Sequence, residues 1–410
     1  MRIIEASNKR AIEALFATKE TTDRAFERKV AAIVHKVRTG GDKALLRFAR
    51  QFDNLTQPVE VSRDEMEAGA ATVSPQVRLA IAHAARNIAR VAAKQVPKSF
   101  DIEVVKGVRV QQRVDGLARV GCYVPGGRFP LPSSLLMTAV PARVAGVREI
   151  IAVCPRPEGS VMAAAIEAGV TKLFRIGGAH AVAALAYGTE SIPRVDKIVG
   201  PGNKWVAQAK AQVTSDCAID FYAGPTEIVV VAATGNPKWV AADLIAQAEH
   251  DPEARSVLIT WRRSFADRVS KAVDKMAKGR DIVTTSLAGH GAIVIAKDAD
   301  DAMRLSNRFA PEHLVVESEA LIEGAVIAGA VFVGPFTAQA AGDYATGSNH
   351  VLPTAGAARF RGGLSAADFV RVMAVQRVTA DGLARLAPTI VPLAQAEGLR
   401  GHAESIQVRL

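Results

Sequence analysis

The sequence predicts an α/β protein with two doubly wound, incomplete Rossmann-like domains, a helical N-terminal segment and a helical C-terminal tail. Three observations predict this class. The chain has 410 residues, more than one ordinary hydrophobic core organises, so two domains are expected. Its apolar residues are mostly aliphatic, and aromatic residues make up only 5 %. From residue 149 onward, short apolar strands alternate with helical segments, which is typical of parallel sheets covered by helices on both faces.

The first hundred residues favour helices, because apolar residues recur at three- and four-residue spacing in 31–37, 44–52 and 77–93. Residues 104–114 (VVKGVRVQQRV) then alternate, as a strand or hairpin does. A first series of strands is predicted at 149–154, 172–176 and 197–199, with helices at 161–169 and 180–188. A second series has strands at 227–232, 256–260 and 292–296, with helices at 238–250, 265–277 and 300–309.

The tail after Gly363 differs in character from the rest of the chain. Residues 366–397 read as helix without strand signals, and their apolar periodicity is too weak to form a separate core. We therefore expect the tail to pack on another subunit.

The formal net charge of +10 raises the question of nucleic-acid binding. Basic and acidic residues are interspersed, and no basic run is interleaved with aromatic residues, so we expect no nucleic-acid partner. Positive charge would equally steer an anionic small molecule such as a dinucleotide. No stretch reaches the roughly 20 apolar residues of a membrane span, and MRIIEASNKR lacks the apolar region of a signal peptide. A cytoplasmic protein without a membrane partner is expected.

Gln247 and His250 lie three residues apart where the helix 238–250 ends before Asp251-Pro252. Their side chains can address one point, which would make half of a metal site. The alternative is a histidine in a last helical turn that interacts with the helix dipole.

Glu312 and His313 carry the two commonest general acid–base groups. On an extended strand they would point to opposite faces, so both reach one pocket only if the turn at Pro311 brings them together. An exposed turn pair is the alternative.

Asp343 lies in a loop rich in Gly, Ser, Thr and Asn, where turn capping is the ordinary role of an aspartate. It also offers an oxygen ligand, and His350 a further imidazole. Two glycine turns, GPGN (200–203) and YVPGG (123–127), expose backbone groups and suggest a phosphate or ribose cradle, although the third glycine of the dinucleotide fingerprint is missing.

Taken together, these segments resemble the histidinol dehydrogenase family over essentially the whole chain. The motifs occur in order as YVPGG (123–127), GGAHAVAALAYGTE (177–190), VDKIVGPGN (195–203), AGPTEI (223–228), AADLIAQAEHDP (241–252), APEHL (310–314), GDYATGSNHVLPT (342–354) and AEGLRGH (396–402).

The resemblance implies a zinc- and NAD-dependent enzyme of histidine biosynthesis. It would oxidise L-histidinol to L-histidine by two hydride transfers, through an aldehyde. The implied zinc ligands, which also surround the substrate, are Gln247, His250, Asp343 and His402. His402 would come from the partner subunit of a homodimer with shared active sites.

The resemblance also implies roles for the remaining residues. His313 would act as general base and contact the substrate, and Glu312 would activate the water that attacks the aldehyde. Thr226 and Glu397 would bind the substrate, Glu397 at its amino end. The implied cofactor contacts are Tyr123, His180 and Asn203.

From these assignments we expect the following division of the chain. Residues 1–16 form the helical N-terminal segment, and 364–410 form the tail on the partner subunit. Residues 17–122 with 227–363 form a first α/β domain that carries the zinc and catalytic residues, and 123–226 form the second, on the cofactor side.

Three residues depart from the family pattern: His180 replaces a common Gln, Thr226 replaces a common Ser, and Arg128 adds a cation near the site. They leave open a related dehydrogenase for another small alcohol such as sulfopropanediol, although Glu397 suits the cationic amine of histidinol. A zinc hydrolase, which would need no NAD, and a basic binding module are the alternatives from other classes.

Overall fold

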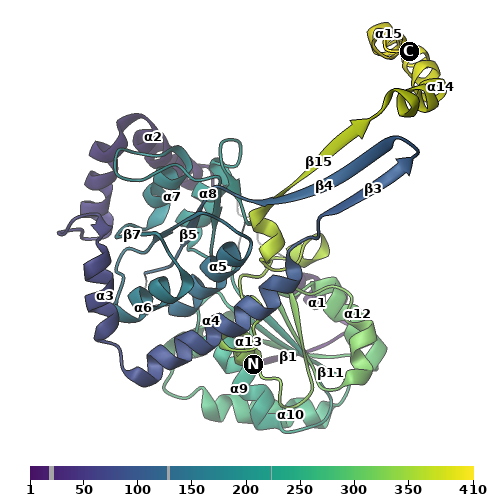
Figure 1. Ribbon diagram of the computed structural model, residues 1–410. Helices are drawn as coiled ribbons and strands as arrows, with labels where there is room; N and C mark the ends of the chain where they lie inside the picture. The colour runs from purple at the N-terminus through teal and green to yellow at the C-terminus, as the bar shows by residue number, and fades with distance from the viewer. Residues whose placement is uncertain (18–22, 127–129, 223) are drawn as a thin grey trace.

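A computed structural model describes residues 1–17, 23–126, 130–222 and 224–410. Two six-stranded sheets, each covered by helices, form the body of the molecule, and a three-stranded antiparallel ribbon projects from it (Figure 1). The mixed α/β class with two doubly wound units is thus confirmed.

The first sheet, sheet A, has the strand order β1-β12-β11-β10-β13-β14, and all neighbouring strands are parallel. Its strands are β1 Arg2–Glu5, β10 Glu227–Val231, β11 Arg255–Thr260, β12 Ala292–Ile295, β13 His313–Val316 and β14 Ala330–Val333. Alternate residues of β10 enter different cores, because successive side chains point to opposite faces. One face packs on α9 Pro237–Ala248, α10 Arg263–Met276 and α11 Asp281–His290, and the other on α1 Lys9–Phe16 and α12 Ala299–Phe309.

The second sheet, sheet B, has the order β2-β7-β6-β5-β8-β9 and is parallel except for β2. Its strands are β2 Glu60–Val61, β5 Arg119–Tyr123, β6 Glu149–Val153, β7 Lys172–Phe174, β8 Lys197–Val199 and β9 Ala218–Ile219. One face packs on α3 Arg63–Ala71, α4 Pro75–Gln95, α5 Pro132–Val144 and α6 Gly159–Ala168. The other packs on α2 Arg24–Phe52, α7 Gly178–Tyr187 and α8 Lys204–Gln212.

The projecting part, which we call the arm, combines segments far apart in sequence. The hairpin β3 Phe100–Val105 and β4 Val108–Gly116 pairs with β15 Val370–Val378, and α14 Ala380–Ala396 and α15 Arg400–Gln407 follow at its tip (Figure 1). Along the chain, four short segments follow β13 before β15 begins. They are η1 Glu319–Gly324 directly after β13, and, after β14, α13 Gln339–Tyr344 and the 3₁₀ segments η2 Ala357–Arg359 and η3 Ala366–Phe369.

Two expectations about the ends of the chain need correction. The segment 1–16 is not wholly helical, because Arg2–Glu5 adds β1 to the edge of sheet A. The tail is not free of strands either, since Val370–Val378 forms β15. Both strands exist through pairing with residues far away in sequence, which local periodicity does not report.

The strands also divide the body differently from the expected boundaries. β2 and all of β5 except Tyr123 lie within 17–122, which we expected to join the first domain, yet both strands pair in sheet B. Helices α2, α3 and α4 pack on the same sheet. In the part of the chain that the structure describes, no helix is both long and apolar enough to cross a membrane.

Candidate active site

Glu312 and His313 enter sheet A from a tight turn. Helix α12 ends at Phe309, its C-cap Ala310 has a left-handed φ of 56°, and Pro311 prevents the helix from continuing. The turn brings both side chains to the amino-terminal edge of the sheet, where both are buried and His313 Nδ1 lies 3.6 Å from Glu312 Oε2. The exposed turn pair considered from the sequence is therefore excluded.

The Glu312 carboxylate is held by residues at the start of the neighbouring strand β10. Its Oε2 accepts hydrogen bonds from Thr226 Oγ1 at 2.5 Å and from the backbone N–H of Glu227 at 2.8 Å. Gln247 Nε2 in turn donates to Thr226 Oγ1, which links α9 to the same group. Burial raises the pKa of Glu312, so its carboxylate is a stronger base than a free one.

The His313 imidazole has one engaged nitrogen and one unpartnered nitrogen. Nδ1 lies 3.0 Å from the carbonyl oxygen of Glu227, which can only accept, so Nδ1 carries the hydrogen. Nε2 is buried without a hydrogen-bond partner among the described residues and lies 3.8 Å from Asp343 Oδ1. Burial alone would lower the pKa of His313, but the Glu312 and Asp343 carboxylates outweigh it and raise this pKa.

Three of the expected zinc ligands, Gln247, His250 and Asp343, lie on the body of the chain, and Asp343 is next to this imidazole. Gln247 is fully buried, and its Oε1 has no hydrogen-bond partner within the described part of the chain. Asp343, on α13, accepts a hydrogen bond from Gln339 Nε2 at 2.8 Å, and α13 contacts α9. Burial alone would raise the pKa of Asp343, but the charges of His313 and His350 and the hydrogen bond from Gln339 lower it. His250 is exposed just beyond α9.

The remaining expected site residues, Glu397 and His402, lie elsewhere. Glu397 follows α14 and His402 is on α15, and both are exposed at the tip of the arm, away from the body of the same chain (Figure 1). Among the residues described, no group of three or more His, Cys, Asp or Glu side chains could hold a metal. One chain thus assembles only part of the expected ligand set.

Tyr123 and Asn203 mark the facing edge of sheet B. Tyr123 ends β5 and Asn203 follows β8, and these adjacent strands are the point where strand order reverses, the usual ligand crevice of such sheets. Gly200 has a φ of 114°, and an added Cβ would lie 2.2 Å from the Tyr123 carbonyl oxygen, so only glycine fits there. Asn203 is exposed and caps α8 through its side-chain oxygen.

Contacts across the molecule show that the two edges meet. Ser134 lies in the first turn of α5, and its Oγ is 3.4 Å from His350 Nε2. The other ring nitrogen, His350 Nδ1, donates a hydrogen bond to the Asp343 carbonyl oxygen at 3.1 Å. Burial lowers the pKa of His350. The amino-terminal edge of sheet A therefore faces the carboxyl-terminal edge of sheet B.

His180 and Tyr123 are less accessible than expected for cofactor contacts. Tyr123 is 3 % exposed, and its hydroxyl accepts from the N–H of Gly178. His180 is 2 % exposed and donates from Nε2 to Asp53 at 2.8 Å. Sequence reasoning missed Asp53 and Gln339, which no quoted motif contains, and gave no role to Glu227, which lies in AGPTEI. Arg128 lies outside the described residues.

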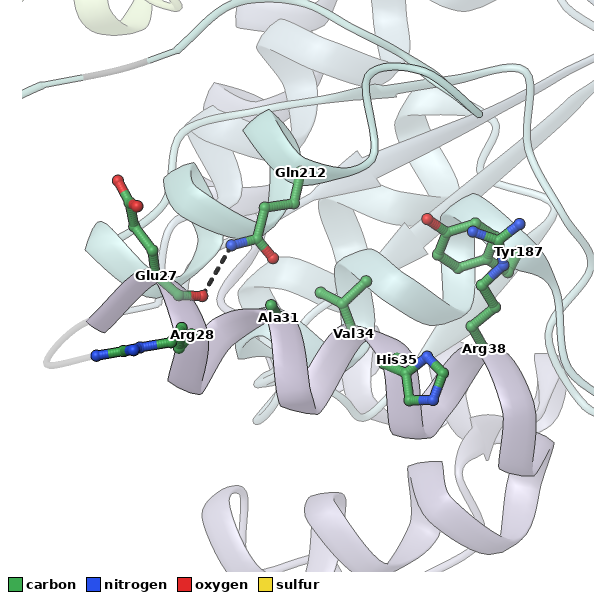
Figure 2. A pocket seen from close by; sticks show the side chains of 8 residues that line it. All are labelled: Glu27, Arg28, Ala31, Val34, His35, Arg38, Tyr187 and Gln212. Atoms are coloured by element: carbon green, nitrogen blue, oxygen red, sulfur yellow. Dashed lines mark hydrogen bonds between the residues drawn. The ribbon is translucent and has the colours of Figure 1, made fainter. Parts of the chain in front are cut away.

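A surface pocket of about 410 Å³ lies along α2, beside Tyr187 at the end of α7 and Gln212 at the end of α8 (Figure 2). It is lined by Glu27, Arg28, Ala31, Val34, His35, Arg38, Tyr187 and Gln212. None of the expected site residues lines it, so it is separate from the edge-to-edge site.

The fold and the site define an α/β protein with a buried glutamate–histidine pair, suited to acid–base chemistry, where two doubly wound domains meet. The family model described as Histidinol dehydrogenase matches residues 16–410. The histidinol dehydrogenase of Nitrosomonas europaea is 44 % identical over 97 % of this chain and 96 % of its own, and that of Methanothermobacter thermautotrophicus is 45 % identical over 93 % and 92 %. The crystal structure of histidinol dehydrogenase from Elizabethkingia anophelis matches with a TM-score of 0.94 at 32 % identity, covering 100 % of this chain and 98 % of that one. This chain belongs to the histidinol dehydrogenase family and is an oxidoreductase.

Proposed function

We propose that this chain oxidises L-histidinol to L-histidine through L-histidinal, reducing two molecules of NAD. The observation that carries the proposal is the His313 imidazole, whose Nε2 is buried and has no partner among the described residues. Its Nδ1 is held by the Glu227 carbonyl oxygen, so Nε2 is the nitrogen that can take a proton. The relatives that match over nearly the whole chain support histidinol over another small alcohol.

In the proposed reaction, His313 Nε2 takes the hydroxyl proton while a hydride leaves the carbinol carbon. Tyr123 and Asn203 would hold NAD at the facing edge of sheet B, and bound NAD would accept the hydride in both steps. Glu312 takes a proton from water as the water oxygen attacks the aldehyde carbon, and His313 returns its proton to the aldehyde oxygen, which gives the hydrate and frees Nε2 again. His313 then takes a proton from the resulting hydrate while the second hydride leaves, and the product is a carboxylic acid.

The residues present fit a zinc ion. Gln247 offers a buried amide oxygen that has no other partner in the described chain, Asp343 a carboxylate oxygen, and His250 an imidazole. His402 of a second subunit would complete a mixed nitrogen and oxygen set of the kind that zinc accepts. Bound zinc would anchor the imidazole and amine of the substrate, and Thr226 and Glu397 would hold its polar end.

We further propose a homodimer with shared active sites. The strand register puts Phe100, Ile102, Val110 and Val372 on one face of the ribbon and Asp101, Glu103, Arg109 and Arg377 on the other. On the apolar face Ile102 and Val372 are 50 % and 54 % exposed, and such a surface favours burial against a partner. The three cysteines are buried free thiols, which suits a reducing cytoplasm.

The test is an NADH assay with purified, zinc-loaded protein. We expect two NADH per histidinol, loss of the activity on chelation of zinc, and no comparable activity with sulfopropanediol. NADH formed from sulfopropanediol but not histidinol would reassign the substrate. Hydrolysis of an ester or amide substrate without NAD, together with no NADH from either alcohol, would make the protein a zinc hydrolase.

A further inference from the structure

Asp53 links three elements at the cofactor edge of sheet B. It is the first residue after α2, and its side chain is 9 % exposed. One oxygen, Oδ2, accepts from the backbone N–H of Gly177 at 2.9 Å and from His180 Nε2 at 2.8 Å. The carboxylate therefore sits at the N-terminus of α7, where the helix dipole favours negative charge.

The turn before α7 is fixed by its surroundings. Gly178 has a φ of 59°, and a Cβ on Gly177 would lie 2.9 Å from the Pro155 ring. The next N–H, that of Gly178, donates to the Tyr123 hydroxyl at 2.9 Å. Two successive backbone N–H groups are thus bound by Asp53 and Tyr123, and neither is open to a phosphate.

His180 is placed to support this arrangement and not to contact a ligand. Its ring lies 6.1 Å from each of the Phe48 and Phe52 rings, and its side chain is 2 % exposed. Nε2 donates to Asp53, and Nδ1 lies on the side of Gly178.

We infer that Asp53 and His180 are a pair of positioning residues: together they hold the Gly177–Gly178 turn, and through it the Tyr123 hydroxyl, in place for the cofactor. The inference rests on the proposed use of NAD. It assigns His180 a role different from the direct cofactor contact expected from the sequence. It also means that the pyrophosphate binds away from the N-terminus of α7, since the Asp53 carboxylate already lies there.

The experiment measures the NAD dissociation constant of the zinc-loaded protein by calorimetry, with kcat and KM for NAD beside it. Asp53→Asn and His180→Ala should each weaken NAD binding about tenfold, as expected for loss of one charge-assisted hydrogen bond. The double variant should be no weaker than either single one, because both act through the same turn. His180→Gln keeps a donor for Asp53 and should stay within about twofold of the unaltered protein.

Asp42→Asn is the matched control. Asp42 lies on the same helix α2 and accepts from Ser191 Oγ at 2.5 Å, beyond the other end of α7, so NAD binding should not change. In all variants kcat at saturating NAD should change less than KM.

Three results would overturn the inference. Tighter NAD binding by Asp53→Asn would mean that the carboxylate repels a phosphate at α7. Additive losses in the double variant would mean that His180 contacts NAD itself. Unchanged NAD binding by a folded Asp53→Asn variant would mean that the Asp53 carboxylate has no positioning role for the cofactor. If Asp53→Asn does not fold, equal NAD binding by His180→Gln and His180→Ala would be decisive against the pair. Absence of NAD binding by the unaltered protein would instead refute the proposed function, and the inference with it.

Discussion

His313 lies between two carboxylates, and its proton affinity depends on both. Glu312 and Asp343 raise the pKa of this buried imidazole, although burial alone would lower it. A base whose pKa is near the working pH transfers protons most effectively. The pair Glu312–His313 is therefore a chemical unit in which each group tunes the other.

We expect His313→Ala and Glu312→Gln to impair different steps. His313→Ala removes the base for both oxidations and should lower kcat about 10²- to 10⁴-fold. Glu312→Gln should slow hydration of the aldehyde more than oxidation of the alcohol. A single-turnover measurement would then give close to one NADH per site in place of two. Thr226→Ser, which keeps the hydroxyl on Glu312, should still give two; equal loss of both NADH in Glu312→Gln would contradict these roles.

Asp243, on α9, provides a prediction about pH and stability. Burial raises its pKa from 3.8 to about 6, so folding favours the protonated form. The stability it contributes is complete below about pH 4 and is lost as pH rises through 6. Asp243→Asn should therefore raise the free energy of unfolding at pH 8 by about 1 kcal/mol, a value discounted for partial exposure. Urea unfolding at pH 8 and pH 4 checks this, since the gain should vanish at pH 4.

At the scale of elements, the arm is the part of the chain that most needs a partner. Every residue of β3 is exposed, and most apolar side chains of the ribbon lie on the face of Ile102 and Val372, although Met373 and Val375 lie on the other. A two- or three-stranded ribbon without a covered apolar face has little stability of its own in water. The alternation in 104–114 already predicts a strand or hairpin, whereas 370–378 becomes a strand only through its pairing with 108–116.

Ile102→Asp should weaken the dimer, because it puts a charge on the apolar face of β3. We expect at least a tenfold rise in the dimer dissociation constant, measured by analytical ultracentrifugation. Glu103→Gln, one residue along on the opposite face, should leave the dimer unchanged. A monomeric parent protein, or equal behaviour of the two variants, would contradict the proposed interface.

At the scale of the whole molecule, two sheet edges are brought together, and in the proposed homodimer the arm of a second subunit supplies the third component of the site. The amino-terminal edge of sheet A carries the acid–base pair, and the carboxyl-terminal edge of sheet B faces it through Ser134 and His350. Glu397 and His402 are on the arm and cannot complete the site of their own chain in this arrangement (Figure 1).

A mixing experiment tests whether sites are shared. His250→Ala and His402→Ala homodimers should each lose zinc and activity, as each lacks a ligand. After the two variants are mixed and reassembled, activity should return to about a quarter of that of the unaltered protein. Half of the dimers are then mixed, and each mixed dimer keeps one intact site. Zinc content should recover in parallel; no recovery, despite proven subunit exchange, would contradict a shared site.

The sequence by itself determined the alternation of strands and helices, and it also marked the residues of the acid–base pair and most of the expected ligands. The elements and these residues can be recognised from local periodicity, from the positions of Pro and Gly, and from side-chain chemistry. All three are properties of residues close together in the sequence. Only the tertiary structure decided that the turn at Pro311 directs the side chains of Glu312 and His313 into the same pocket.

Tertiary structure alone also decided that β1 and β15 are strands, that residues 24–95 pack on sheet B, and that Asp53 reaches His180. The physical reason is the same in each case. Strand pairing and buried hydrogen bonds join residues dozens to hundreds of positions apart, and their free energy depends on partners that a local pattern does not contain.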